Sequence, residues 1–160
     1  MAVTHFELTN EWHLAAPIDR VWELIAATED WPRWWRAVAR VEQLQAGTAD
    51  GLGSVYRMHW KTALPYTLRF DVETVRVEKD RAIEGRAFGE LDGTGLWTFT
   101  ETRDGTIARY VWRVEVAKPW MRLMSPVLRP VFAWNHHKVM GWGEADARKR
   151  LAIQSHSRER

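Results

Sequence analysis

The chain has 160 residues, of which 46% are hydrophobic and 28% charged, an ordinary globular composition that excludes intrinsic disorder. Its net charge is +2 and its basic residues form no dense block, so the basic footprint of a nucleic-acid-binding protein is absent. The chain has no cysteine, which excludes disulfides, thiolate metal ligands and cysteine nucleophiles. Residues 1–11 lack the pattern of a signal peptide, and no uncharged apolar run reaches about 18 residues. We therefore expect a cytoplasmic protein without a transmembrane helix.

Tryptophan is unusually abundant, with 11 residues in the chain. An indole is large and carries an N–H group that needs a partner when buried, so a core seldom contains so many. Two interpretations remain open at this point. The tryptophans either form a solid core, or they line a cavity for a flat, apolar or conjugated ligand.

The N-terminal part predicts one strand and two short helices. Residues 5–14 alternate with a period of two, which predicts a strand, and Pro17 favours the first turn of a helix. Residues 28–35 then predict a second helix that carries Trp31, Trp34 and Trp35. So short an element should not bury three indoles in one core, so we expect some of them to face a cleft or the surface. There they would form a lid over the cavity.

The middle of the chain predicts a series of antiparallel strands. One face of each strand is apolar and the other charged, which is typical of a sheet covered on one side only. The Arg103-Asp104-Gly105 sequence predicts a hairpin before the last strand. The expected strands are 38–44, 55–61, 66–77, 82–88, one that carries Trp97 and Phe99, and a last one that ends near residue 116.

The C-terminal part predicts a long helix over residues 131–151. Pro119 starts this final segment, and Pro126 and Pro130 interrupt it early, so we expect its first part to be bent or broken. We interpret residues 1–153 as a single domain and residues 154–160 as a polar, frayed tail.

Several segments resemble the START-like or Bet v 1-like (SRPBCC) superfamily, and within it the bacterial polyketide cyclase/dehydrase-type proteins. They are the stretch from Ala16 to Trp35, Leu64-Pro65-Tyr66, residues 89–97, residues 110–114, and Asn135-His136 with Met140 and Gly143. The resemblance covers about residues 5 to 151. It implies an α+β helix-grip fold, with a curved antiparallel sheet of about seven strands around a long C-terminal helix and two short helices after the first strand.

Apolar and aromatic side chains on the inner face of this sheet and on the closing helix are the candidate ligand-binding residues. A few polar groups among them would orient a ligand. The candidates are Trp31, Trp34, Trp35, Met58, Trp60, Tyr66, Leu68, Phe70, Trp97, Phe99, Tyr110, Trp112, Phe132, Asn135, His136 and Val139.

His136 is the best candidate for a catalytic residue, because an imidazole on the cavity side of the helix could act as a general base. The alternative is a structural histidine beside the helix seam. No histidine spacing matches a metal site, and we expect neither a metal nor a cofactor. The loop with Glu90 and Asp92 has glycines that indicate a turn rather than a phosphate site.

Three functions remain compatible with the sequence. The first is binding or carriage of a hydrophobic small molecule such as a lipid, isoprenoid or polyketide. The second is a cyclase, dehydratase or aromatase that acts on a polyketide-like substrate. The third is a partner-binding or regulatory module that docks another protein or a membrane surface through Trp31, Trp34 and Trp35.

Overall fold

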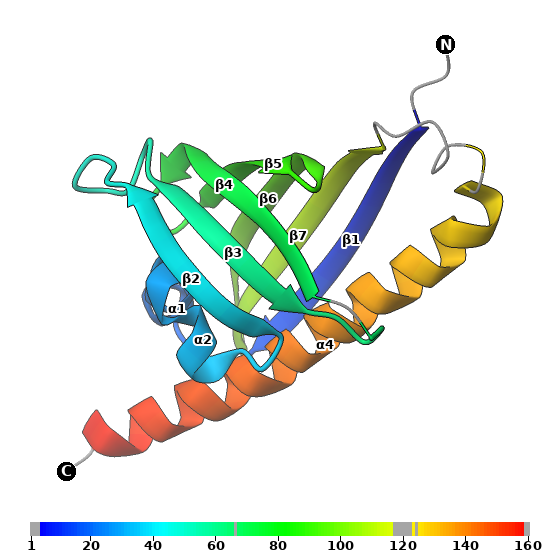
Figure 1. Cartoon of the computed structure of the whole chain (residues 1–160). Helices are drawn as coiled ribbons and strands as arrows, with labels where there is room; N and C mark the ends of the chain where they lie inside the picture. Colours follow the sequence, from blue (N-terminus) through cyan, green and yellow to red (C-terminus); the bar gives the residue numbers. More distant parts are fainter. Residues whose placement is uncertain (1–3, 66, 117–122, 124, 159–160) are drawn as a thin grey trace.

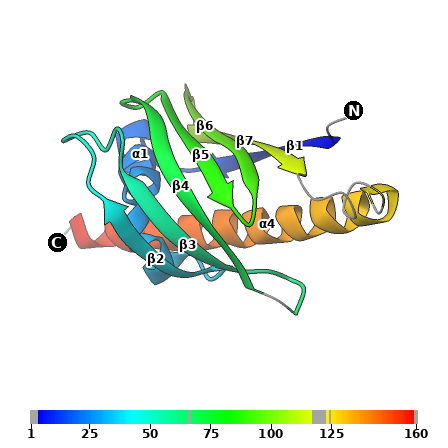
Figure 2. The same cartoon turned by 45° about the horizontal axis from the view of Figure 1, so that its top comes forward.

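The computed structural model describes residues 4–65, 67–116, 123 and 125–158, and it has the α+β helix-grip fold (Figure 1). Its strands form one seven-stranded antiparallel sheet in the order β1-β7-β6-β5-β4-β3-β2. Two short helical segments follow the first strand, and a long helix closes the open side of the sheet (Figure 2). The strands are β1 (Thr4–Leu14), β2 (Val38–Gln45), β3 (Val55–Lys61), β4 (Thr67–Glu78), β5 (Ala82–Gly89), β6 (Asp92–Thr102) and β7 (Gly105–Val116). The helices are α1 (Ile18–Ala26), η1 (Thr28–Asp30), α2 (Trp31–Trp34) and α4 (Ser125–Arg158).

The register of β6 and β7 confirms the predicted alternation. Trp97 pairs with Tyr110 across the two strands, and both side chains lie on the inner face with Trp112. Arg109 and Arg113 are exposed on the outer face. A shift by one residue would have exchanged the two sets, because successive side chains in a strand point to opposite faces.

Helix α4 packs closely against the sheet because Gly143 has no side chain. A Cβ atom at Gly143 would lie 2.5 Å from the Trp12 ring and 2.6 Å from the Trp35 ring. The Trp35 indole N–H donates a hydrogen bond of 3.1 Å to the backbone oxygen of Val139. Close to these contacts, the Arg36 guanidinium contacts the Asp146 carboxylate of α4 at 2.7 Å. These contacts fix the middle of α4 against β1 and α2.

The two ends of α4 differ from the prediction. The helix already includes Pro126 and continues through Pro130, which removes one backbone hydrogen bond without ending it. It also continues to Arg158, beyond the predicted end at residue 151. The side chain of Gln154 accepts a hydrogen bond from Arg20, which ties this end to α1. Pro119 lies outside the described residues.

The three tryptophans of the second helical segment are all buried, so the prediction that they could not share one core is wrong. Trp34 stacks on Trp35 with ring centroids 5.5 Å apart and contacts Trp12 edge-on at 6.4 Å. The Trp31 indole N–H donates to the backbone oxygen of Ile25 at 3.0 Å. The core extends between β1, β2 and α4 around this segment, so a short element can be buried on more than one side.

Candidate functional site

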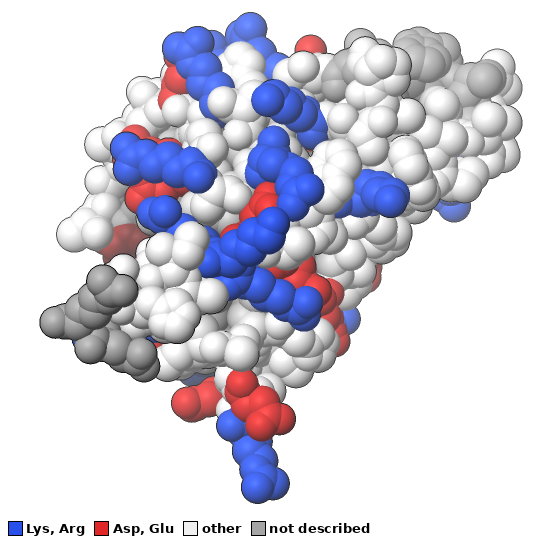
Figure 3. Space-filling view, turned by 90° about the horizontal axis from the view of Figure 1, so that it is seen from below, with Lys and Arg blue, Asp and Glu red and all other residues white. Residues whose placement is uncertain are grey.

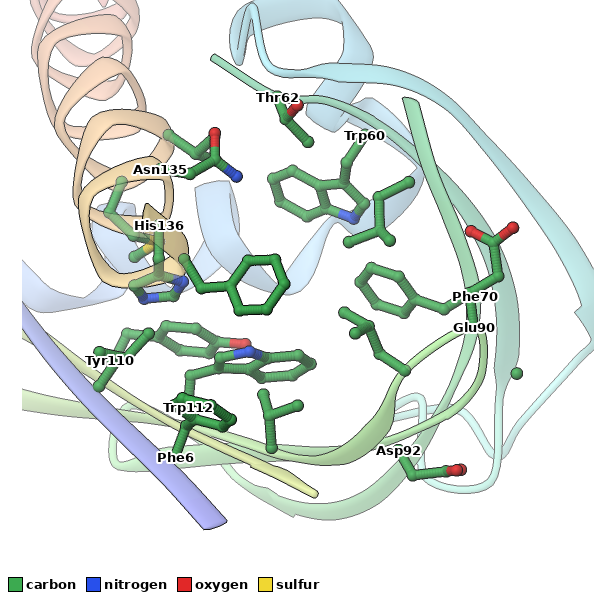
Figure 4. A pocket seen from close by; sticks show the side chains of 18 of the residues that line it. Phe6, Trp60, Thr62, Phe70, Glu90, Asp92, Tyr110, Trp112, Asn135 and His136 are labelled. Atoms are coloured by element: carbon green, nitrogen blue, oxygen red, sulfur yellow. The ribbon is translucent and has the colours of Figure 1, made fainter. Parts of the chain in front are cut away.

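A cavity of about 570 Å³ lies between the inner face of the sheet and α4 (Figure 4). Such a volume is typical of sites for small organic ligands. Its exposed lining residues mark the opening, and they come from the start of β4, from the end of β5 through to the start of β6, and from the end of β7: Thr67, Gly89, Glu90, Asp92 and Glu115. Its buried lining residues are Trp31, Trp35, Phe70, Trp97, Val114, Val139 and Met140.

Most of the candidate ligand-binding residues border this cavity. They come from four parts of the chain: the segment after α1, the strands β3 and β4, the strands β6 and β7, and α4. The structure therefore has a hollow interior rather than a solid core. The residues that it brings together are Trp31, Trp35, Trp60, Leu68, Phe70, Trp97, Tyr110, Trp112, Phe132, Asn135, His136 and Val139.

Three other candidates lie elsewhere. Trp34 is packed between Trp12 and Trp35 and does not border the cavity, so its assignment to the ligand site and to a lid is corrected. Phe99 packs edge-on against Trp22 with centroids 5.4 Å apart, in the core beneath α1. Met58 borders a smaller adjoining space of about 80 Å³. Tyr66 lies outside the described residues.

Part of the lining was not among the candidates. Phe6, Leu8 and Val114 occupy inner positions of β1 and β7, where the period of two could have revealed them. Glu90 and Asp92 were interpreted as turn residues, and they lie at the opening with their carboxylates away from the interior (Figure 4). The backbone N–H of Arg69 donates to the Glu90 carboxylate at 2.8 Å. Because Glu90 lies between β5 and β6, strand alternation does not predict to which side its side chain points. Leu91, Thr62, Gly89, Thr67, Glu115 and Met140 complete the lining.

Gly95 gives Tyr110 its place in the cavity wall. A Cβ atom at Gly95 would lie 2.3 Å from the Tyr110 hydroxyl oxygen, so no larger residue fits without moving the ring. Tyr110 in turn lies against Trp97, with ring centroids 4.7 Å apart. Burial raises the pKa of Tyr110 well above its ordinary value, so the phenol stays neutral at physiological pH.

His136 is a second buried titratable group in the cavity wall. Its ring stacks on Tyr110, with centroids 6.2 Å apart and an interplanar angle of 18°. Burial, together with the charge of His137, lowers the pKa of His136 to about 4, so the imidazole is neutral at pH 7. Its Nε2 atom is buried without a hydrogen-bond partner among the described residues.

Two further polar groups border the cavity. The Trp60 indole N–H is likewise buried without a partner in the described part of the chain. Asn135 is held in place, because its Oδ1 atom accepts a hydrogen bond of 2.7 Å from the backbone N–H of Ala63. Buried polar groups normally have partners. His136 and Trp60 therefore offer unused hydrogen-bonding capacity inside an otherwise apolar wall.

A metal site is not found in the part of the chain that the structure describes, where no three acidic or histidine side chains converge. Among the helices of the described residues, none has the length and apolar character needed to span a bilayer.

Comparison with known proteins places the chain in a family. The family model for polyketide cyclase/dehydrase and lipid transport matches residues 5–148, nearly the whole chain. The chain belongs to this polyketide cyclase/dehydrase and lipid transport family. No curated protein matches the chain.

Solved structures confirm the fold that the family shares. The Zhui aromatase/cyclase from Streptomyces sp. R1128 has a TM-score of 0.71 at 18% identity, over 96% of this chain and 96% of that one. A START superfamily protein from Mycobacterium smegmatis has a TM-score of 0.73 at 15% identity, over 94% and 98%. The di-domain aromatase/cyclase StfQ of the steffimycin biosynthetic pathway has a TM-score of 0.70 at 17% identity. The match to StfQ covers 92% of this chain but 52% of StfQ, so the chain spans about half the length of that relative.

Proposed function

We propose that this protein binds and carries a hydrophobic small molecule, such as a lipid, an isoprenoid or a polyketide-like compound, in the cavity beneath α4. The observation that carries the proposal is the cavity of about 570 Å³ with its aromatic and aliphatic wall. Burial of a ligand there would contribute ~25 cal/mol for each Å² of apolar surface removed from water. The affinity therefore requires no charged anchor, and none of the buried lining residues is an acidic or basic one.

Polar groups at two sides of the cavity would set the orientation of the ligand. The Trp60 N–H can donate to a carbonyl or hydroxyl oxygen of the ligand. The neutral His136 imidazole can donate or accept, depending on its tautomer. A ligand that supplies both partners would satisfy two polar atoms that otherwise remain buried and unpaired, and leaving such atoms unpaired is destabilising.

A cyclase, dehydratase or aromatase activity is the second candidate, and one observation favours it. His136 is a neutral imidazole inside the cavity, with an unpaired Nε2 atom beside the Tyr110 ring. A general base must be unprotonated and within hydrogen-bond reach of the proton it removes. His136 meets the first condition at neutral pH. His136→Gln separates the two functions, because a carrier keeps its ligand whereas an enzyme loses turnover.

The third function, docking of a partner through the tryptophan cluster, is not proposed. It required exposed indoles, and Trp31, Trp34 and Trp35 are all buried.

The test is a titration with N-phenyl-1-naphthylamine, an uncharged fluorescent probe, into wild type and Leu68→Trp. Leu68 faces the cavity from β4, opposite Trp60 in the register, so a larger ring at this position must occupy cavity space. Leu44→Trp is the matched control, because Leu44 is an exposed residue of β2 that does not border the cavity.

We expect saturable binding by wild type and by the control, and at least fivefold weaker binding by Leu68→Trp, equivalent to about 1 kcal/mol. Equal binding by all three proteins, or no binding at all, would remove the support for an internal ligand site.

A further inference from the structure

The outer face of α4 carries an apolar stripe that no other part of the described chain covers. Val127, Val131 and Trp134 follow one another at helical spacing, and their exposed fractions are 62%, 37% and 49%. Leu123, which precedes the helix, is 83% exposed. A hydrophobic row of this kind on a monomer marks an interaction surface. We refer to Val127, Val131 and Trp134 as the outer stripe.

The overall charge of α4 and the lack of acidic residues near the outer stripe indicate what covers it. Helix α4 contains six Lys and Arg residues and two acidic residues, a net charge of +4 in a chain whose net charge is +2. Both acidic residues are neutralised by ion pairs, Glu144 with Arg148 and Asp146 with Arg36. From residue 116 to residue 143 the sequence contains no Asp or Glu.

One basic side chain of the same helix adjoins the stripe. Lys138 is exposed, and its ammonium nitrogen lies 6.0 Å from the centre of the Trp134 ring. Seen from the side of α4, the surface toward the start of the helix is largely uncharged, and Lys and Arg gather next to it (Figure 3). A helix with Trp and aliphatic residues beside basic residues has the composition of one that lies in a membrane interface.

We infer that the outer face of α4 is a docking surface for an anionic phospholipid bilayer. Phosphate headgroups would neutralise Lys138 while the outer stripe enters the region of the acyl chains. A second copy of this chain is a poorer occupant, because two such faces would place like charges opposite each other. The inference goes beyond the proposed function and does not depend on it.

The docking surface on α4 lies next to the cavity, so membrane binding would affect ligand exchange. The first half of α4 carries the outer stripe on one side, and on the other side its Phe132, Asn135 and His136 line the cavity. Phe132 also contacts Phe6, on the neighbouring strand β1, at 6.3 Å. A bilayer bound to this half of the helix would therefore lie beside the ligand site, so that an apolar molecule could pass between membrane and cavity.

The test is co-sedimentation of the full chain with vesicles of phosphatidylcholine alone, or of phosphatidylcholine mixed with an equal amount of phosphatidylglycerol. We expect salt-sensitive binding to the mixed vesicles only. Lys138→Gln should weaken it about fivefold, the effect of one basic residue near an anionic surface, and Trp134→Ser at least as much. Leu44→Ser is the matched control, since Leu44 is exposed to the same extent on β2, and it should bind like wild type.

Two outcomes would overturn the inference. One is an absence of wild-type sedimentation with the mixed vesicles, or equal sedimentation of Trp134→Ser. The other is a dimer in gel filtration that Trp134→Ser dissociates without any vesicle binding, which would make a second copy the occupant. Naphthylamine binding by Trp134→Ser should stay at the wild-type level, so failure of this inference is distinguishable from failure of the ligand site.

Discussion

Stability as a function of pH should reveal the burial of His136. Burial lowers its pKa from 6.5 to about 4 in the folded protein, so between these values the unfolded chain binds the proton more readily than the native state. A histidine with a lowered pKa therefore has no effect on stability above about pH 6.5, and it destabilises the fold as the pH falls toward 4. Integration between the two pKa values gives a loss of about 3 kcal/mol at pH 4.

The comparison with His136→Phe isolates this contribution. The variant keeps an aromatic ring against Tyr110 and removes the titrating nitrogen atoms. The carboxylates whose pKa is lowered by ion pairs, such as Asp71 and Asp146, are common to both proteins, so their contribution at acidic pH cancels in the difference. Urea denaturation at pH 7, 6, 5 and 4 should show wild type losing about 3 kcal/mol more than the variant.

A control variant removes an exposed histidine. His13→Phe, on the outer face of β1, should retain the pH dependence of wild type. If wild type and His136→Phe lose the same free energy of unfolding between pH 7 and pH 4, the imidazole is not buried in an apolar wall, and the assignment of His136 to the cavity fails.

Two further substitutions test the wall and the core. Trp34→Ala should destabilise the protein by ~3–5 kcal/mol in chemical denaturation, as expected for a large buried ring, and a loss below about 1 kcal/mol would mean that Trp34 is not core. Gly95→Ala should weaken naphthylamine binding, because the new Cβ forces Tyr110 toward the cavity. Gly141→Ala, in α4 with open space around it, should bind like wild type and be more stable by about 1 kcal/mol. Equal binding by the two glycine variants would contradict the role of Gly95.

Most of the sequence predictions that the structure confirms came from the alternation of side chains along the strands. A strand has only two faces, so the period of two fixed the side on which Trp97, Tyr110 and Trp112 lie, and the structure confirms it. The same rule would have placed Phe6 and Leu8 in the wall. The long helix was predicted from its periodicity over residues 131–151, but its ends were wrong because prolines and polar residues are only local signals.

Properties that depend on packing in three dimensions could not be predicted. The burial of Trp34 requires Trp12, Trp35 and α4 to surround it, and these meet only in the folded chain. The cavity volume depends on contacts such as Gly143 against Trp12, which set how closely α4 approaches the sheet. The place of Glu90 at the opening depends on the path of a turn.

The most direct test of the central claim locates a bound apolar molecule by NMR. Met140 borders the cavity from α4 and is buried, so its methyl group reports on the interior. Val127 and Val131, on the outer face of the same helix, report on the surface. With methyl-labelled protein saturated with N-phenyl-1-naphthylamine, we expect nuclear Overhauser contacts between the probe and the Met140 methyl. Contacts to Val127 and Val131 without any to Met140 would contradict an internal ligand site.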